Sequence, residues 1–292
     1  MATGTRATTA GGGAMRTHLH GMWDAVAGGW RDHAGYADDR AAGVTAEMLA
    51  RTAPAPGEHV IDLACGPGGA GIAAAHRVGS TGRVVLSDVS PAMVAVARGR
   101  AAAAGLVQVE AAVRDLEAIA DPDGTYDVAL CREGLMFVPD PPRATGEILR
   151  VLRPGGRLAL AVWGPRDRNP WLGLVFDAVA AELGRPVPPP GVPGPFALSD
   201  AAALARLLTA AGVADVVIDA HPAPLRAASV GEWWDRTIAL AGPLAVIVAD
   251  LPPAAAARLR DRAAAAVAPY ASPDGLEMPG VTLVASGRRP AL

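Results

Sequence analysis

The chain has 292 residues, of which 51% are hydrophobic, so it can bury a sizeable core as one large domain. Its formal net charge is only -3, and acidic and basic residues are interspersed along it. This excludes the basic stripe that an electrostatic nucleic-acid binder needs. All 26 basic residues are Arg, and the absence of Lys excludes Schiff-base chemistry and a Walker-type phosphate loop.

The chain carries no export or membrane signal that we recognise. Residues 1–16 are rich in Thr, Gly and Ala without an apolar run, which predicts a disordered tail rather than a signal peptide. The most apolar stretch, 240–251, is interrupted by a Gly-Pro pair and is too short to span a bilayer. Cys65 and Cys131 provide neither a disulfide framework nor the spacing of zinc ligands. We therefore expect a cytoplasmic protein without a metal.

Strands and helices can be assigned in chain order. A helical stretch at 17–52 ends at a Pro-Ala-Pro-Gly break, and an apolar run at 59–64 then predicts a buried strand followed by a glycine cluster. Ser90 and Pro91 mark a helix start, with Ser as the N-cap and Pro at the first helical position. Strands are predicted at 59–64, 83–87, 107–113, 126–131, 157–163, 213–218 and 279–286. Further helices are predicted up to about 78, from 90 to about 105, and at 141–152, 169–183, 199–212 (capped by Ser199) and 229–268.

This alternation predicts an α/β fold, in which βαβ units build a parallel sheet with right-handed crossovers. After residue 163 the rhythm changes, because a helix and a Pro-rich linker at 187–195 interrupt it. We expect a disordered tail at 1–16, a helical lid at 17–52, a cofactor-binding core at 53–164, a helix and linker at 165–198, a continuation of the core at 199–228, an inserted helical cap at 229–270 and a final core strand at 271–292.

The glycine cluster after the first strand has the pattern of a nucleotide-cofactor site. Residues 66–71 match G-x-G-x-x-G, and Asp88 follows about twenty residues later, which fits a dinucleotide site. Gly66 and Gly68 let the backbone approach a ligand, and the N-terminus of the following helix favours anionic groups. Pyrophosphate suits such a site, and so does the carboxylate of a methionine group. The glycines alone leave both cofactor types open.

Carboxylates at the ends of successive strands separate these cofactor types. Asp62 precedes the glycines, where it would repel a pyrophosphate but attract an ammonium or sulfonium centre. Asp88 ends the second strand and can accept from ribose hydroxyls, and Asp115 follows the third strand and can accept from an adenine amino group. The pattern therefore favours a sulfonium nucleoside. Plainer structural roles stay open, namely helix capping for Asp62 and Asp88 and a turn for Asp115.

Four segments resemble, in order, the motifs of class I S-adenosylmethionine-dependent methyltransferases. They are Val-Ile-Asp-Leu-Ala-Cys-Gly-Pro-Gly at 60–68, Leu-Ser-Asp-Val-Ser-Pro at 86–91, Tyr-Asp-Val-Ala-Leu-Cys at 126–131 and Leu-Arg-Pro-Gly-Gly-Arg-Leu at 152–158. Their order and spacing resemble the subgroup of quinone-biosynthesis C-methyltransferases and small-molecule methyltransferases of bacterial secondary metabolism. The resemblance covers roughly residues 20–165 and, more loosely, the final strands.

The resemblance implies a doubly wound, mostly parallel seven-stranded sheet in the order 3-2-1-4-5-7-6, with strand seven antiparallel. It implies S-adenosylmethionine at the carboxyl ends of strands one and four. Asp62, Ala64 and Gly66 would then surround the methionine end, and Asp88 would bind the ribose. The residues implied at the adenine, some of which are equally plausible as core residues, are Val89, Met93, Asp115, Leu116 and the backbone carbonyl of Cys131.

The segment after strand four and the N-terminal helices bear on catalysis. The family often has His or Asn after strand four, whereas this chain has Arg132 and Glu133. A base is needed only if the acceptor is a neutral alcohol, phenol, ammonium or carbon acid. The candidates are Glu133, His33 and Tyr36, and an ion pair with an Arg is the alternative role of Glu133. Tyr36, Trp23 and Trp30 form either a cofactor lid or ordinary helix packing.

These observations predict a methyltransferase that uses S-adenosylmethionine to methylate a small, largely apolar organic acceptor by in-line displacement. We expect the helices at 169–183 and 229–268 to cap a mainly apolar pocket. Trp233 and Trp234 either line that pocket or pack between the cap helices. We expect no nucleic-acid partner and no membrane insertion, while the oligomeric state stays open, a homo-oligomer included. Two other classes remain, a cofactor-binding relative that no longer methylates (a cyclase or a binding protein) and an NAD-dependent oxidoreductase.

Overall fold

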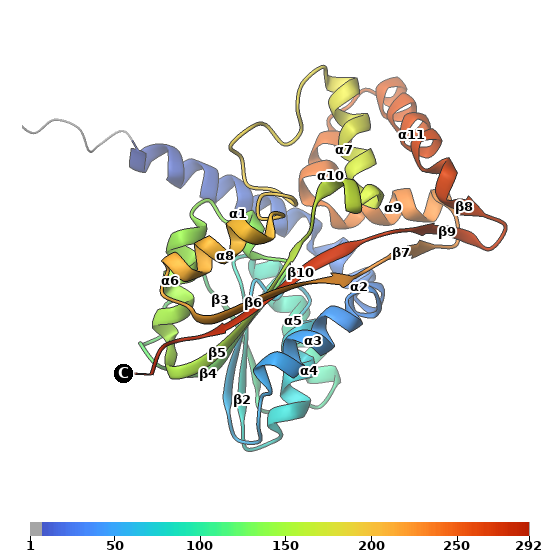
Figure 1. Ribbon diagram of the computed structural model, residues 1–292. Helices are drawn as coiled ribbons and strands as arrows, with labels where there is room; N and C mark the ends of the chain where they lie inside the picture. The colour runs from blue at the N-terminus through green and yellow to red at the C-terminus, as the bar shows by residue number, and fades with distance from the viewer. Residues whose placement is uncertain (1–7, 292) are drawn as a thin grey trace, which may run out of the picture.

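The protein is described by a computed structural model that covers residues 8–291, and its centre is a twisted seven-stranded sheet (Figure 1). The strand order is β3-β2-β1-β4-β5-β10-β6. Strand β10 runs antiparallel to both of its neighbours, and the other pairs are parallel. Since β10 is the seventh strand of this sheet in chain order, the predicted order and the α/β fold class are confirmed. The strands are β1 His59–Leu63, β2 Arg83–Asp88, β3 Val109–Val113, β4 Tyr126–Arg132, β5 Leu152–Trp163, β6 Ala214–Pro222 and β10 Val281–Arg288.

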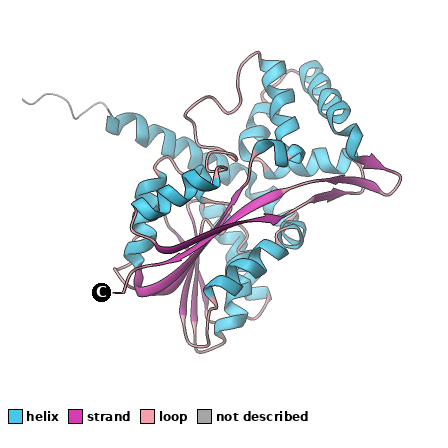
Figure 2. Cartoon of the chain, viewed as in Figure 1, coloured by secondary structure: helices cyan, strands magenta, loops and turns pink. Residues whose placement is uncertain are grey.

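The central strands are buried along nearly their whole length because helices cover both faces of the sheet (Figure 2). On one face, α3 (Ala42–Thr52), α4 (Gly69–Val78) and α5 (Pro91–Ala103) pack on the strands. On the other face lie α6 (Pro141–Val151) and α8 (Ala201–Ala210). This two-sided cover leaves the strand ends as the place where a ligand can enter.

Helix caps largely follow the predicted chemistry. The Ser90 hydroxyl accepts from the Met93 amide at 3.1 Å and caps α5, as predicted. Helix α8 is capped by Asp200 instead of Ser199, because the Asp200 carboxylate accepts from the Ala203 amide. The Ser199 hydroxyl donates to the preceding turn. The N-cap prediction at Ser199 was therefore wrong by one residue.

The N-terminal region forms three helices where one helical stretch was predicted. Helix α1 (Thr8–Asp32) ends just before His33, and a short helix α2 (Ala34–Arg40) precedes α3. The predicted tail at 1–16 differs from the structure over residues 8–16, which belong to α1, while residues 1–7 lie outside the described residues. Small residues gave only a weak local signal, and a helix can extend from a packed segment at little further cost.

The inserted helices form a separate cluster beside the carboxyl ends of the strands (Figure 1). They are α7 (Pro170–Leu183), α9 (Val230–Leu240), α10 (Gly242–Ala249) and α11 (Pro253–Val267). Trp233 and Trp234 are buried in this cluster, and the Trp233 indole donates to the Trp171 carbonyl at 3.0 Å. Neither residue lines the cavity that lies over the carboxyl ends of the strands. Of the two roles expected for Trp233 and Trp234, the structure therefore supports packing between the inserted helices.

A small second sheet, unexpected from the sequence, extends from the far end of β6 and β10 (Figure 1). Its strands are β7 (Leu225–Ala227), β9 (Gly275–Met278) and β8 (Ala271–Ser272), in the order β7-β9-β8. These strands are too short to leave a periodic pattern, and their pairing joins segments on either side of the inserted helices. The pairing of β7 with β9 thus brings together the two chain segments that enter and leave the inserted helices α9 to α11.

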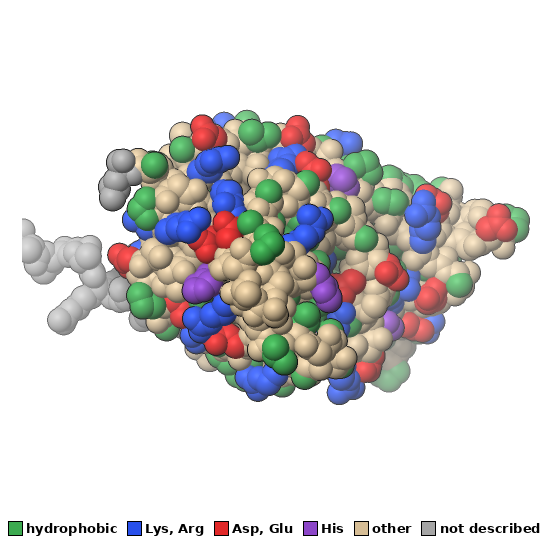
Figure 3. Space-filling view, turned by 90° about the horizontal axis from the view of Figure 1, so that it is seen from below, with side chains coloured by type: hydrophobic (Ala, Val, Ile, Leu, Met, Phe, Trp, Pro, Cys, Tyr) green, Lys and Arg blue, Asp and Glu red, His purple; other side chains and the backbone are tan. Residues whose placement is uncertain are grey.

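On the face seen in Figure 3, Arg and acidic side chains are interspersed. Across residues 8–291, no helix is long and apolar enough to cross a membrane. The same residues contain no cluster of His, Cys, Asp and Glu that could hold a metal ion.

Candidate active site

The turn between β1 and α4 depends on left-handed backbone conformations. Ala64, Gly66 and Gly68 have φ values of 49°, 52° and 87°. A Cβ on Gly71 would overlap Leu86 of strand β2 and crowd Asp62. Gly66 therefore allows the tight turn, whereas Gly71 allows helix α4 to pack directly on the sheet.

Asp62 lies buried beneath this turn. Its Oδ2 accepts from the Gly71 amide at 2.7 Å, so one oxygen serves the helix N-terminus. Its Oδ1 is buried and has no hydrogen-bond partner in the described chain. Burial raises the pKa of Asp62 to about 7, although the nearby Arg132 guanidinium opposes this shift. A buried, unpaired carboxylate oxygen fits the attraction of a cationic group.

Asp88 at the end of β2 holds the glycine turn. Its Oδ2 accepts from the Gly66 amide at 2.9 Å and its Oδ1 from the Ser90 amide at 3.0 Å. Burial raises the pKa of Asp88, and these backbone donors oppose the shift. Asp88 also lines the cavity over the strand ends. The carboxylate is therefore oriented by the backbone, with a side open to a ligand.

One cavity collects most of the predicted site residues. The predicted residues that line it are Trp30, Tyr36, Ala64, Gly66, Asp88, Val89, Met93, Asp115, Leu116 and Glu133. Four predicted residues are not in its wall. Asp62 and Cys131 are buried beneath it, Gly68 packs against Leu86 and Ala97, and His33 lies at the junction of α1 and α2. His33 is thus not positioned as a base in this cavity.

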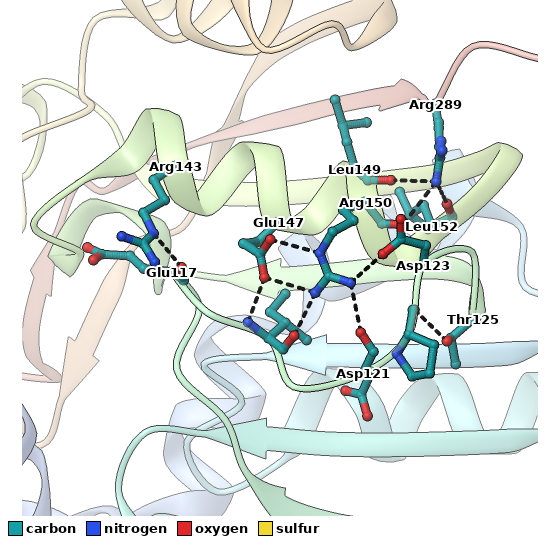
Figure 4. Close-up of polar contacts among 12 residues, drawn as sticks. Glu117, Asp121, Asp123, Thr125, Arg143, Glu147, Leu149, Arg150, Leu152 and Arg289 are labelled. Atoms are coloured by element: carbon teal, nitrogen blue, oxygen red, sulfur yellow. Dashed lines mark hydrogen bonds and ion pairs between the residues drawn. The ribbon is translucent and has the colours of Figure 1, made fainter.

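The loop after β3 is fixed by hydrogen bonds to helix α6 (Figure 4). Arg150 donates to the carbonyls of Ile119 and Asp121, and its partner Glu147 accepts from the Ile119 amide at 2.8 Å. Asp115 Oδ1 accepts from the Glu117 amide at 2.9 Å, so it does serve the turn. Because Asp115 also lines the cavity, the turn holds this residue in the cavity wall.

Glu133 follows β4 with a left-handed backbone, φ 60°. Thr282 of β10 donates to its carboxylate at 3.3 Å. Arg132 turns away from it and donates to Thr45 and to Asp38 on the N-terminal helices. Within the part of the chain that the structure describes, Glu133 forms no ion pair, so the alternative role expected for it is not seen. Glu133 also lines the cavity.

The aromatic residues of the N-terminal helices border the same cavity. Trp23, Trp30 and Tyr36 all line it, and the Trp30 indole donates to the Leu240 carbonyl of α9 at 3.0 Å. Trp23 meets Phe137 edge to face, with ring centroids 4.9 Å apart. The N-terminal helices thus cover the cavity with these aromatic side chains, and the same side chains pack against other helices.

Sequence reasoning missed the residue that attaches this cover to the core. Asp38 pairs with Arg100 of α5 at 2.5 Å and with Arg132 of β4 at 3.2 Å. Arg100 also donates to the Pro67 carbonyl in the glycine turn. A single Asp in a helix carries no local signal for such a role, since its partners lie far away in the sequence.

The far wall of the cavity is aromatic and was also missed. Phe137, Trp163 and Trp171 form a series of edge-to-face contacts, with centroids 6.2 and 5.1 Å apart. Asn169 fixes this wall: it is fully buried, and its amide donates to the carbonyls of Gly164, Pro165 and Val281 and accepts from the Val281 amide and the Trp171 indole.

The two cysteines are both free and buried. Burial raises the pKa of Cys131 to about 12 and that of Cys65 above its usual value. Neither thiol is therefore ionised at neutral pH, which fits a packing role.

Comparison with known proteins shows what part of this chain is similar to. Residues 54–168 match the family model of a methyltransferase domain. A ubiquinone/menaquinone biosynthesis C-methyltransferase from Hydrogenovibrio crunogenus is 44% identical over 123 residues, which cover 42% of this chain and 48% of that protein. Nocamycin O-methyltransferase from Saccharothrix syringae is 34% identical over 146 residues, 48% of this chain and 52% of that protein. The chain thus spans about half the length of the curated relatives it matches.

Solved structures extend the likeness beyond that domain. The 4+2 cyclase SpnF is 25% identical with a TM-score of 0.53, over 85% of this chain and 80% of that one. A Bacillus halodurans protein described as a candidate methyltransferase is 19% identical with a TM-score of 0.58, over 85% and 99% of the two chains, which shows the same fold. The family model covers strands β1 to β5, the glycine turn, and the carboxylates of Asp62, Asp88, Asp115 and Glu133. Residues 54–168 therefore form a domain of the class I S-adenosylmethionine-dependent methyltransferase type, and the cofactor of that domain is S-adenosylmethionine.

Proposed function

We propose that this protein methylates a small, largely apolar organic molecule by in-line displacement. The observation that carries the proposal is a single cavity lined both by the cofactor motifs and by the aromatic wall beneath the inserted helices. Relatives named for C- and O-methylation of small molecules support it. A cytoplasmic location, the absence of a nucleic-acid partner and the oligomeric state stay predictions.

The residues of the glycine turn and the strand ends would hold the cofactor. The unpaired Oδ1 of Asp62 fits the cationic methionine end, and Asp88 fits the ribose hydroxyls. Met93 and Leu116 offer apolar surface for the adenine, with Asp115 at its edge. The bound cofactor supplies a methyl group that its sulfonium already activates. The protein then needs mainly to position the acceptor and to exclude water.

The lid and the cap would provide that exclusion. Residues 17–52 contribute Trp23, Trp30 and Tyr36, and the inserted helices contribute Trp171 and Phe176 of α7, to one continuous wall. A wall of this kind suits an apolar acceptor, because burying apolar surface stabilises the complex by about 25 cal/mol per Å². We propose the expected division into lid, core and cap on this basis.

Glu133 is the proposed base for a protic acceptor. This residue lines the cavity, and the Thr282 hydroxyl holds one of its carboxylate oxygens. Tyr36 suits the role less well, because burial raises the pKa of its phenol. Tyr36 would donate a hydrogen bond at neutral pH, while Glu133 would accept the acceptor's proton.

The test is to incubate the protein with S-adenosylmethionine and a panel of phenols, hydroxyquinones and 1,3-dicarbonyl compounds, and to measure S-adenosylhomocysteine. Once an acceptor is found, we expect Glu133→Gln to lower kcat about 100-fold while the affinity for S-adenosylhomocysteine stays unchanged. Glu110→Gln, which removes a carboxylate of an exposed ion pair, is the control. Equal kcat values for wild type and Glu133→Gln would exclude Glu133 as the base.

The likeness to SpnF favours a second candidate, a relative that binds the cofactor without transferring its methyl group. That likeness spans 85% of the chain, whereas the family model covers only residues 54–168. Conversion of a substrate without formation of S-adenosylhomocysteine would support this function. We do not propose the nicotinamide oxidoreductase, because the family identifies another cofactor.

A further inference from the structure

Arg40, at the end of α2, presents uncommitted hydrogen-bond donors to the cavity. Its guanidinium carbon lies 4.0 Å from the centroid of the Trp171 ring. The group makes one long hydrogen bond, from Nη2 to the Ala223 carbonyl at 3.4 Å, and its Nε is buried without an acceptor. No carboxylate among the described residues lies within ion-pair distance of it. The other Arg residues of the cavity wall each have a carboxylate partner: Arg114 with Asp121, Arg132 with Asp38, and Arg236 with Glu232.

A second uncommitted donor lies one helical turn before Arg40. The Tyr36 hydroxyl is buried and has no hydrogen-bond partner in the described chain. The Arg236 guanidinium lies 3.5 Å from the centroid of the Tyr36 ring, and both Arg40 and Arg236 act to lower the pKa of the phenol. Leaving buried donors unpaired costs about 1–3 kcal/mol each, so these groups are arranged for a partner that the chain itself does not supply.

We propose that Arg40, assisted by Tyr36, binds a carboxylate at one end of an otherwise apolar methyl acceptor. This rests on the proposed function and names the acceptor class of that site. Trp171 covers one face of the guanidinium, so its in-plane N–H edges remain for a ligand, and a planar pair of oxygens matches that edge. A single cation without a carboxylate partner balances a monoanion better than a phosphate dianion.

Charge also determines how the two ends of such an acceptor are oriented in the cavity. Glu133 belongs to the same cavity and would repel a carboxylate. The acid end therefore lies at Arg40, and the methylated end lies toward Glu133. Arg40 acts as a specificity residue in this arrangement and takes no part in the proton transfer.

The test measures binding and requires no turnover. The protein saturated with S-adenosylhomocysteine is titrated calorimetrically with octanoate, 3-phenylpropanoate and naphthalene-2-carboxylate, and with their primary amides. We expect wild type to bind at least one acid about tenfold more tightly than its amide. Phenylphosphonate is titrated in parallel. Equal binding of every acid and its amide, or tighter binding of phenylphosphonate than of any carboxylate, would overturn the proposal.

Variants then assign the preference to Arg40. We expect Arg40→Met to lose the tenfold preference for the acid, Arg40→Lys to keep part of it, and Tyr36→Phe to weaken acid binding by a smaller factor. Arg206→Met, at an exposed position on α8, is the control and should match wild type. An unchanged preference in Arg40→Met would refute the assignment. If Arg40→Met does not fold, the affinity for each acid relative to its amide is compared between wild type and Arg40→Lys. An equal ratio in these two proteins would refute the assignment to Arg40.

The two proposals can fail separately. An Arg40-dependent preference for acids supports this inference even if no acceptor of the panel yields S-adenosylhomocysteine, a result that counts against methyl transfer to the panel compounds alone. Methylation of acceptors without an acid group, at rates equal to those of their acidic analogues, would leave methyl transfer standing and refute the carboxylate.

Discussion

At the scale of single residues, backbone strain gathers at the switch point of the sheet. Ala64 and Glu133 have left-handed φ values and follow the neighbouring strands β1 and β4. A Cβ on Gly134 would overlap Ala64, so the two turns touch. A left-handed non-glycine residue costs about 1–2 kcal/mol, which the surrounding packing must offset. The fold thus holds the Glu133 carboxylate in place through its backbone.

Asp88 is the residue on which cofactor affinity should depend most directly. It orients the glycine turn through Gly66 and faces the cavity. Because hydrogen bonds to a charged group contribute about 1.5–3 kcal/mol, we expect Asp88→Ala to weaken S-adenosylmethionine binding at least about tenfold by isothermal titration. Asp261→Ala, an exposed carboxylate on α11, is the control. Unchanged affinity in Asp88→Ala would refute the ribose role.

Asp62 should make stability depend on pH. Its pKa rises from about 3.8 in the unfolded chain to about 7 in the folded one, so the folded state binds more protons between these values. Its favourable contribution is fully present below about pH 4 and is lost as the pH rises to about 7. Asp62→Asn keeps an acceptor for the Gly71 amide but cannot ionise. We therefore expect the unfolding free energy of wild type to fall relative to this variant from about pH 5 to 7 in urea titrations. Parallel pH profiles would contradict the raised pKa.

At the scale of elements, Asn169 joins the end of β5, the start of α7 and the start of β10. Its amide group makes five hydrogen bonds in the buried wall of the site. Asn169→Ala would remove this partner from the Gly164 carbonyl, the Val281 amide and the Trp171 indole, so we expect a loss of at least about 3 kcal/mol in the free energy of unfolding, measured with urea. Gln108→Ala, which removes one partly buried hydrogen bond, should cost about 1 kcal/mol or less. Similar losses in the two variants would show that Asn169 has no special structural role.

The elements that the sequence predicted well share a physical feature. Continuous apolar runs, as in 59–64 and 126–131, identify strands buried on both faces, and they were found within one residue. The small sheet was missed because strands of two to four residues leave no period to detect. Strand β5 was predicted from residue 157 but begins at Leu152, since its first residues pair only through the tertiary structure. The break of the N-terminal helices at His33 has no Pro, and the glycines near it lie inside the two helices, at positions 28, 29 and 35.

At the scale of the whole molecule, the lid is held to the core through Asp38 at the glycine turn. A Cβ on Gly69 would overlap Asp38 Oδ1 and crowd Arg132. Since Asp38 can move, Gly69→Ala should release the lid while the core stays folded. We expect several-fold weaker binding of S-adenosylmethionine and faster proteolytic cleavage within residues 8–40. Gly99→Ala, at a helical position with open space for a Cβ, should instead raise stability by about 0.5–1 kcal/mol and leave cofactor affinity unchanged. Wild-type cleavage rates in Gly69→Ala would refute this role of Asp38.

The residues proposed to hold the cofactor stay predictions. The sequence by itself was enough to predict the α/β fold and, through its resemblance to known motifs, the sheet order and the cofactor. These depend on short motifs in which each strand, turn and carboxylate are adjacent in the chain, so local pattern is enough. Only the tertiary structure brought together the proposed acceptor half, where Arg40, Trp171 and Glu133 line one cavity from segments far apart in the chain. It also showed which Arg residues have carboxylate partners, because charge pairing depends on distances in space, and a sequence does not contain them.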